Sequence, residues 1–477
     1  MWRVIRTGLL AVLVGHVSIL AGSAGAVASV PLNFSTFLGG AADDDGFMAA
    51  TDAAGNVYVS GWTDSANLPV LNAEQPAYGG SRDAFVAAFT PAGSPIYLTY
   101  LGGSGADRGY YIRADAAGNV FVAGATSSRD FPIANAIQPT YGGGSGDGFL
   151  SVLDATGKLL TSTYLGGRGF DAANLDAVDP TGAIYVAGNT ASGNFPVTVA
   201  SAQQPTKAAG TDTWVMRLDP SARATLWSTF LGGGGAEQPY GMQADAAGNV
   251  FVSTLTSSAN FPTKIPWQPA YGGGQDVTLT KYGPAGQMSW STYYGGSGLD
   301  RVNGVDVDPA GNVYIAGQTA SSNLPTLHPH QSVFGGGVDG LLASFSGSSG
   351  ALRYATYLGG RGADWFGGVV ADGTGRAYVV GGSTTPALPT PGGSQRRNAG
   401  GMDAYVALLS VSGGSIVYGT YLGGSSTDGI GSAAFAPDGS LWLAGHTRSA
   451  NFPTVPSSGS SLAGGWDAFV SHLGPVP

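Results

Sequence analysis

Seven acidic residues recur at one position of this sequence, each four places after a pair of glycines. Carboxylate oxygens are the ligands that Ca²⁺ prefers, so these positions are candidate metal ligands, and Ca²⁺ is the one cofactor that the sequence suggests. The same side chains could instead accept hydrogen bonds from N–H groups of their own glycine-rich loops. Sevenfold repetition favours this structural interpretation, and the spacing of an EF-hand loop is absent. The seven residues are Asp44, Asp107, Asp171, Glu237, Asp300, Asp364 and Asp428.

A second series of acids stands at the ends of the long loops of the chain. If both series lie on one face of the fold, up to fourteen carboxylates gather there. The run Asp43-Asp44-Asp45 is the densest acidic stretch and the one local candidate for a metal site. The second series consists of Asp83, Asp147, Asp212, Asp276, Asp339, Asp403 and Asp467.

Aromatic residues on and around the long loops are candidate ligand-binding residues. These loops run to about twenty residues, whereas compact folds prefer ~4–6, and loops of this length are usually functional. Aromatic rings beside amides and carboxylates suit sugars, whose apolar faces stack while their hydroxyls form hydrogen bonds. The alternative is that the rings only hold the loops against neighbouring strands. The candidates are Trp62, Tyr78, Tyr141, Trp267, Tyr271, Phe334 and His446.

No catalytic residue is predicted. The chain has no G-x-S-x-G, H-E-x-x-H or G-x-x-x-x-G-K motif and no cysteine. A hydrolase or lyase that uses carboxylates of the loop face is the alternative to a binding module. Such an enzyme needs an acid with a displaced pKa beside a second functional group in a cleft.

A pentapeptide close to Thr-Tyr-Leu-Gly-Gly occurs seven times and sets the positions of all these candidates. Its first glycine stands at residues 39, 102, 166, 232, 295, 359 and 423, so the period is 63 to 66 residues. A fixed period of this size predicts a repeat architecture. Each unit holds four short runs rich in β-branched and aromatic residues, separated by turn sequences such as Asp115-Ala116-Ala117-Gly118-Asn119.

Seven units of four antiparallel strands predict an all-β, seven-bladed β-propeller. Residues 32–40 look like the fourth strand of a unit, and the chain ends with a third strand, so we expect the N-terminal strand to complete the last blade and close the ring. The expected domain spans residues 29–477. Its expected blades are residues 41–103, 104–167, 168–233, 234–296, 297–360, 361–424, and 425–473 completed by 32–40.

The units resemble the seven-bladed β-propeller repeat family, abbreviated SBBP. The resemblance rests on Thr-Tyr-Leu-Gly-Gly-x-x-x-Asp, then Asp-x-x-Gly-Asn-Val-Tyr-Val-Ala-Gly-x-Thr, then Phe-Pro, and it covers residues 32 to 473. It implies an exported bacterial propeller of the cell-surface type. It implies no established reaction and transfers no catalytic residue.

The first 28 residues differ from the rest of the chain. Arg3 and Arg6 form a basic start, Leu9 to Ala21 is largely apolar, and Ala26-Val27-Ala28 offers a small-residue cleavage site. This pattern predicts a signal peptide that is cleaved near Ala28, and a mature chain that is secreted, periplasmic or on the cell surface. Because the apolar run is shorter than the ~20 residues of a spanning helix, we expect cleavage rather than an uncleaved membrane anchor. No second long apolar segment follows in the sequence, so we expect no membrane span after cleavage.

The charge of the chain limits its partners. The formal net charge is −10, and an acidic surface repels phosphate backbones, so we expect no nucleic-acid partner. The sequence favours an exported, monomeric binding module whose long-loop face engages a polysaccharide or a cell-surface protein. A structural envelope protein without a small ligand is the remaining alternative, since the fold does not decide among these functions.

Overall fold

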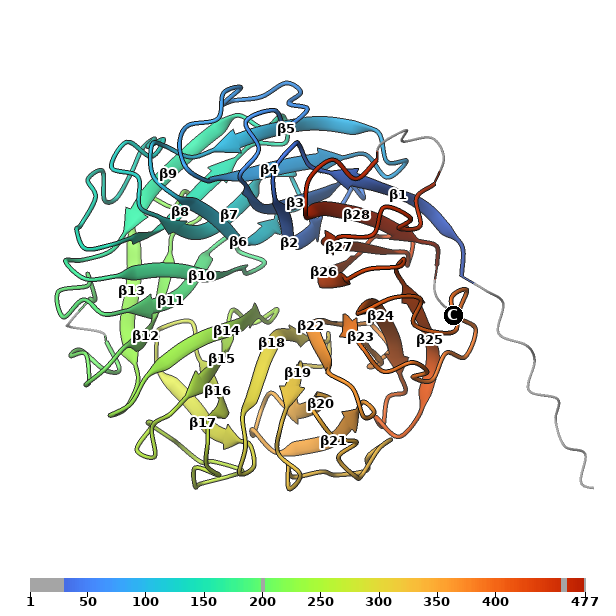
Figure 1. Cartoon of the computed structure of the whole chain (residues 1–477). Helices are drawn as coiled ribbons and strands as arrows, with labels where there is room; N and C mark the ends of the chain where they lie inside the picture. Colours follow the sequence, from blue (N-terminus) through green and yellow to red (C-terminus); the bar gives the residue numbers. More distant parts are fainter. Residues whose placement is uncertain (1–29, 199–201, 456–460, 476–477) are drawn as a thin grey trace, which may run out of the picture.

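The computed structural model describes residues 30–198, 202–455 and 461–475 (Figure 1). Its strands form seven separate four-stranded sheets arranged as a ring. The described ranges contain no helix, and therefore none long and apolar enough to cross a membrane. The predicted signal peptide, residues 1–28, lies outside the described residues.

Each sheet is an antiparallel blade, as predicted, and we call its strands a, b, c and d from the axis to the rim. In that order, blades 1 to 7 consist of β2 (Asp44–Thr51), β3 (Val57–Thr63), β4 (Asp83–Phe89), β5 (Pro95–Leu101); β6 (Asp107–Ala114), β7 (Val120–Thr126), β8 (Asp147–Leu153), β9 (Leu159–Leu165); β10 (Asp171–Val178), β11 (Ile184–Thr190), β12 (Asp212–Leu218), β13 (Thr225–Leu231); β14 (Glu237–Ala244), β15 (Val250–Thr256), β16 (Asp276–Tyr282), β17 (Met288–Tyr294); β18 (Asp300–Val307), β19 (Asn312–Thr319), β20 (Asp339–Ser346), β21 (Leu352–Leu358); β22 (Asp364–Ala371), β23 (Ala377–Ser383), β24 (Asp403–Leu409), β25 (Ile416–Leu422); and β26 (Asp428–Phe435), β27 (Leu441–Thr447), β28 (Asp467–Leu473), β1 (Leu32–Leu38).

The ring closes through the N-terminal strand, which confirms the prediction. β1 pairs with β28 from Leu32 opposite Leu473 to Leu38 opposite Ala468. Strand d of the last blade therefore comes from the start of the chain, and the two ends lie side by side in Figure 1. Closure of this kind leaves neither terminal strand with an unpaired edge inside the ring.

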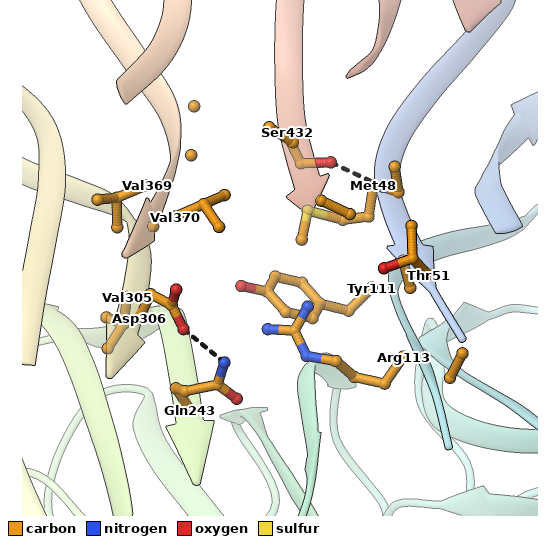
Figure 2. Close-up of a pocket in the computed structure, with 18 of the residues that line it drawn as sticks. Met48, Thr51, Tyr111, Arg113, Gln243, Val305, Asp306, Val369, Val370 and Ser432 are labelled. Carbon is orange, nitrogen blue, oxygen red and sulfur yellow. Dashed lines mark hydrogen bonds between the residues drawn. The ribbon is translucent and has the colours of Figure 1, made fainter. Parts of the chain in front are cut away.

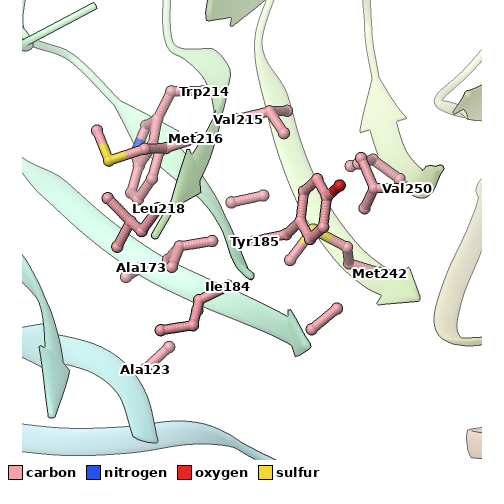
Figure 3. Packing of buried hydrophobic residues seen from close by; sticks show 14 of the residues in the cluster. Ala123, Ala173, Ile184, Tyr185, Trp214, Val215, Met216, Leu218, Met242 and Val250 are labelled. Atoms are coloured by element: carbon pink, nitrogen blue, oxygen red, sulfur yellow. The ribbon is translucent and has the colours of Figure 1, made fainter. Parts of the chain in front are cut away.

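Neighbouring blades pack face to face, so their middle strands are buried on both sides. One cluster joins three blades: Ala123 of blade 2, Trp214 of blade 3 and Val250 of blade 4 belong to it (Figure 3). The Trp214 indole is fully buried and stacks on Phe195 with ring centroids 4.5 Å apart. Rings also meet between blades, as where Trp227 of blade 3 lies 5.8 Å from Tyr282 of blade 4 between ring centroids.

The long b–c loops lie across the outer strands. In blade 2, Ala134 of the loop exchanges backbone hydrogen bonds with Ser162 of strand d, and equivalent bridges occur at Leu71, Lys264 and Leu327. The loops therefore cover an edge that would otherwise present unpaired N–H and C=O groups. The end of each loop then reaches the d–a connection to the next blade, as where Arg82 bridges to Ala106. Both connections lie on one face, which we call the long-loop face.

Candidate binding site in the central channel

The first series of acids closes the d–a loops. The Asp44 carboxylate accepts hydrogen bonds from the Gly40 N–H at 2.7 Å, from the Ser65 hydroxyl at 3.0 Å and from the Thr63 hydroxyl. Glu237 does the same in blade 4 with its longer side chain, accepting from the Gly233 N–H at 3.0 Å. All seven side chains are buried, one at the start of each strand a. This geometry fits the structural interpretation, because both oxygens of Asp44 accept hydrogen bonds from groups of its own blade and of the adjoining loop.

Each acid of the second series lies near an acid of the first series, and the first glycine of a double glycine lies between the two carboxyl groups. Asp83 accepts hydrogen bonds from the Gly79 N–H at 2.8 Å and from the Gln75 amide at 3.1 Å. A Cβ atom on Gly102 would lie 2.7 Å from the Asp83 carboxyl carbon and 2.8 Å from an Asp107 oxygen, so only glycine fits between the two carboxyl groups. The structure therefore distributes the fourteen acids as seven pairs. In the part of the chain that the structure describes, no group of three or more His, Asp or Glu residues is placed to hold a metal ion.

Burial of the paired acids changes their titration. Removal of water from a carboxylate favours its protonated form, and the neighbouring carboxylate of the pair adds to this effect at Asp83. In six members of the second series, one carboxyl oxygen is also buried without a hydrogen-bond partner among the described residues. Burial raises the pKa of Asp276 to about 7, and raises to about 6 the pKa of Asp44, Asp83, Asp147, Asp212 and Asp339.

Four of the seven predicted aromatic and histidine candidates hold the long loops against the blades. Tyr78, for example, packs edge-on against Tyr100 of strand d with centroids 5.8 Å apart. Such T-shaped contacts contribute about 0.5–1.5 kcal/mol beyond the buried area. Because the four rings belong to four different blades, the structure does not bring them together. The four contacts are Tyr78–Tyr100, Tyr141–Tyr164, Tyr271–Tyr293 and Phe334–Tyr357.

The other three candidates lie apart from one another. Trp62 is covered by the Arg82 guanidinium, 3.6 Å above the ring. Trp267 is 39% exposed on the rim and contacts Tyr294. His446 alone lies at the central channel.

A β-bulge repeats in every strand a, and the seven bulges form the wall of the channel on the side of the long-loop face. In each blade the register of strands a and b shifts after the third residue of strand a, so the fourth residue has no partner. Bulges re-aim a side chain without ending the strand, and they are enriched at functional sites. Here all seven residues are half-buried and line one cavity. They are Phe47, Tyr110, Asn174, Tyr240, Asn303, Gly367 and Gly431.

The cavity at these bulges, which we call the channel mouth, opens toward the long-loop face and has a volume of about 520 Å³. Its composition breaks the sevenfold symmetry of the scaffold. At the bulge position, blades 1, 2 and 4 contribute aromatic rings, blades 3 and 5 amides, and blades 6 and 7 glycines. The two glycines pack against the backbone of the next blade, since a Cβ on Gly367 would lie 2.5 Å from the Gly431 carbonyl oxygen. Trp365, the residue after the acid in blade 6, and His446 of blade 7 also line the cavity.

Polar contacts fix the side chains of the channel mouth. The Arg301 guanidinium lies 4.2 Å from the Tyr240 ring and donates a hydrogen bond of 2.7 Å to the Asn303 side-chain oxygen. The Asn303 amide in turn donates to the carbonyl of Phe366 at 2.7 Å. The Trp365 indole N–H contacts the Met402 sulfur at 3.2 Å. These contacts hold one cation, one amide and two aromatic rings in place before a ligand arrives.

His446 and Asp45 join the last blade to the first at the edge of the channel mouth. The His446 Nδ1 atom lies 3.0 Å from an Asp45 carboxylate oxygen. Burial lowers the pKa of His446, but the hydrogen bond to Asp45 and the negative charges of Asp45 and Asp428 together outweigh this effect and raise the pKa. The T-shaped contact with Trp466, at 4.9 Å between ring centroids, restricts the orientation of the imidazole.

The bulge residues were not predicted from the sequence, although a signal for them exists. Each stands three places after the acid of the first series. Aromatic residues, amides and glycines occupy this position in different blades, whereas the acid itself recurs in all seven. The bulge that directs these residues toward the channel depends on the register of strands a and b, which the amino-acid sequence alone does not indicate.

Comparisons with known proteins support the fold. The family model SBBP, beta-propeller repeat, matches residues 96–132 and 289–325, so the chain carries repeats of this family. No curated protein matches the sequence. A protein of unknown function from Dyadobacter fermentans is 10% identical over 94% of this chain and 99% of its own, with a TM-score of 0.43.

Two further solved propellers are similarly distant. The β-propeller domain of the Trilobed protease from Pyrococcus furiosus is 9% identical over 87% of this chain and 90% of its own, with a TM-score of 0.40. A europium-containing methanol dehydrogenase is 11% identical over 93% of each chain, with a TM-score of 0.40. At these identities and scores, no function is transferred from these proteins.

Proposed function

We propose that this chain is an exported binding module that takes a polysaccharide at the channel mouth on the long-loop face. One observation carries the proposal: seven bulges place seven residues on one cavity, five of them with side chains, and these residues depart from the symmetry of the scaffold. Residues that only support the ring repeat in every blade, as the paired acids do. Channel residues that differ from blade to blade fit a ligand that lacks sevenfold symmetry.

The chemistry of the channel mouth favours carbohydrate. Tyr110, Tyr240 and Trp365 offer aromatic faces for the apolar side of a sugar ring, while Asn303 and Arg301 offer hydrogen bonds to hydroxyls. Pockets with aromatic walls and a few placed polar groups are the usual form of small-ligand sites. Export rests on the sequence pattern of residues 1–28.

A soluble-polysaccharide array tests the proposal, probed with the mature chain, residues 29–477. It should include neutral polymers such as xylan, dextran and galactomannan, and uronate polymers such as alginate and pectin. We expect binding to a confined set of polymers. Binding to none of them contradicts the proposal and favours a protein partner or a structural envelope role.

A pair of tryptophan variants then locates the site. Trp365→Ala removes the largest ring of the channel mouth, and we expect at least a tenfold loss of affinity, in line with ~1.5 kcal/mol or more for a buried aromatic contact. Trp267→Ala removes an equally large ring from the outer rim and serves as the matched control. The opposite result, loss only with Trp267→Ala, places the site on the long loops.

A hydrolase or lyase is the second candidate function, and the His446–Asp45 pair favours it. An imidazole oriented by a carboxylate at the edge of a cavity has the geometry of a general base. Incubation with the polysaccharides that bind should then release reducing ends or unsaturated products, and His446→Ala should abolish this release. A binding module leaves the polymers intact.

A further inference from the structure

The channel mouth is cationic although the chain as a whole is acidic. The chain has 30 aspartate and glutamate residues against 20 lysine and arginine residues. Among the described residues that line the channel mouth, Arg301 and His446 can carry positive charge, and none is an aspartate or a glutamate. His446 is paired with Asp45 outside the lining, at 3.0 Å, so its charge is balanced. Arg301 therefore decides the sign of charge that this cavity prefers.

Arg301 has no carboxylate partner. It is the second residue of β18 and follows the buried Asp300. Within the described residues, no nitrogen of Arg301 lies within 4.0 Å of a carboxylate oxygen. Its Nε atom donates to the Asn303 side chain and its guanidinium lies against the Tyr240 ring, whereas neither Nη atom donates to a described residue. The guanidinium is thus held in place with its outer N–H groups available to a ligand.

A fixed guanidinium edge matches the two oxygens of a carboxylate. Arginine–carboxylate pairs are frequently bidentate, with two parallel N–H···O hydrogen bonds that also fix the orientation of the ligand. Because Tyr240 and Asn303 already restrain Arg301, little side-chain freedom is lost on binding. The acidic surface opposes an anionic ligand only weakly, since charges farther apart than the Debye length of ~8 Å are largely screened at about 0.15 M salt.

A second group at the channel mouth needs a hydrogen-bond donor from the ligand. Asn174 is the bulge residue of blade 3, and its side-chain oxygen is buried without a hydrogen-bond partner in the described part of the chain. A carboxylate cannot satisfy this oxygen, because both groups are acceptors, but a hydroxyl can. A sugar acid carries both groups on one ring, and the aromatic walls of Tyr110 and Trp365 suit its apolar face.

The cavity next to the channel mouth favours neither sign of charge (Figure 2). It has a volume of about 290 Å³ and shares Met48, Tyr111 and Gly367 with the channel mouth. Arg113 and Asp306 both line it, so a cation and an anion face the same space. Through shared wall residues it continues into a third cavity, of about 980 Å³, lined by the turns between strands a and b. The preference for an anionic ligand therefore comes from the channel mouth alone.

We infer that the ligand of the channel mouth is a polyuronate, a polysaccharide that carries uronic acids. A carboxylate of the polymer pairs with Arg301, and a hydroxyl of the same polymer donates to Asn174. The inference rests on the proposed function, which it narrows from polysaccharides in general to acidic ones.

Calorimetric titration of the mature chain with polygalacturonate, alginate, the methyl esters of both and dextran tests the inference. Methyl esterification removes the charge of the carboxylate and leaves the sugar rings and hydroxyls in place. We expect a polyuronate to bind and its ester to bind at least tenfold more weakly. If the ester binds as tightly as the acid, or if only neutral polymers bind, the inference is overturned while the proposed function stands. If no polymer of the array binds, both fail.

Dextran sulfate, a polyanion without carboxylates, separates recognition of a carboxylate from attraction of any negative charge. We expect it to bind at least tenfold more weakly than the polyuronate. Equal binding of the two polymers overturns the assignment of a carboxylate at Arg301.

A pair of arginine variants provides a readout that unfolding does not mimic. Arg301→Gln should weaken binding of the polyuronate at least tenfold, since a charge-assisted contact is lost, and should leave the weaker binding of its ester unchanged. Arg108→Gln is the matched control, because Arg108 has the same place in β6 of blade 2 but does not line the channel mouth. An equal loss in both variants indicates attraction by overall charge and contradicts a contact at Arg301.

Discussion

Deletion of Leu32–Leu38 removes the strand that closes the ring, and its cost can be worked out from the structure. Phe34, Phe37 and Leu38 are 9%, 9% and 5% exposed, so each is almost fully buried. At ~1.5–3 kcal/mol for each buried side chain, their loss costs about 5–9 kcal/mol. This equals a large share of the ~5–15 kcal/mol that usually separates folded from unfolded protein. The deletion also leaves β28 with an unpaired edge.

The assay is urea unfolding of the mature chain, followed by far-ultraviolet circular dichroism and by tryptophan fluorescence. We expect the deletion to lower the unfolding midpoint strongly or to abolish folding. Phe37→Ala should cost about 3–5 kcal/mol, as large-to-small changes of buried phenylalanine do. Asn33→Ala in the same strand is the control, because its side chain is exposed and its effect should stay within ~0.5 kcal/mol. An unchanged midpoint after the deletion refutes closure through β1 as a source of stability.

Three further changes test the supporting scaffold. Gly102→Ala should destabilise the fold by about 1–3 kcal/mol in urea unfolding, because the added Cβ atom would lie 2.7 Å from an aspartate carboxyl carbon. Gly193→Ala is the control and should be neutral, because its Cβ atom would have no neighbour within 4 Å. The free energy of unfolding should fall as pH rises from about 4 to 6. Burial raises the pKa of Asp147 and its counterparts to about 6, so the native state binds protons that the unfolded chain releases. Asp147→Asn should make this dependence on pH less steep, and a free energy of unfolding that rises over the same interval contradicts the reasoning. Tyr100→Phe should lower the free energy of unfolding by about 1–3 kcal/mol. The buried hydroxyl donates to the Ser65 carbonyl at 2.8 Å and accepts from the Leu68 N–H at 2.9 Å. Tyr141→Phe should be neutral in the same assay, because the hydrogen bond of 3.3 Å that its hydroxyl makes is exposed.

The ring and its closure could be predicted because the same pattern of strands and turns recurs in seven units. Strand-forming runs, turn sequences and the double glycines recur at one period, so each unit supports the assignment of the others. The acid at the start of each strand a was also predicted as a loop cap. Its hydrogen bonds are local, to the Gly40 N–H in the first blade, and local bonds follow from sequence spacing.

The channel could not be predicted in the same way. Phe47, Tyr110 and Tyr240 lie on different blades, and only closure of the ring brings them to one cavity. Arg113 and Asp306 line one cavity although they are 193 positions apart, and the repeat period gives no sign that these two residues share it. Loop length was a weaker guide than expected, since the long loops also cover the outer strands.

The repeated bulge has a consequence for how this protein can change. The bulged residue has no partner in strand b, so a substitution at the five bulges that carry a side chain leaves the strand ladder and the loop caps untouched. Gly367 and Gly431 are different, because a Cβ there would clash with a backbone oxygen of the next blade. Duplicated blades could thus diverge in what they recognise while remaining interchangeable as building blocks, and a library randomised at the five positions should yield folded proteins with new ligands.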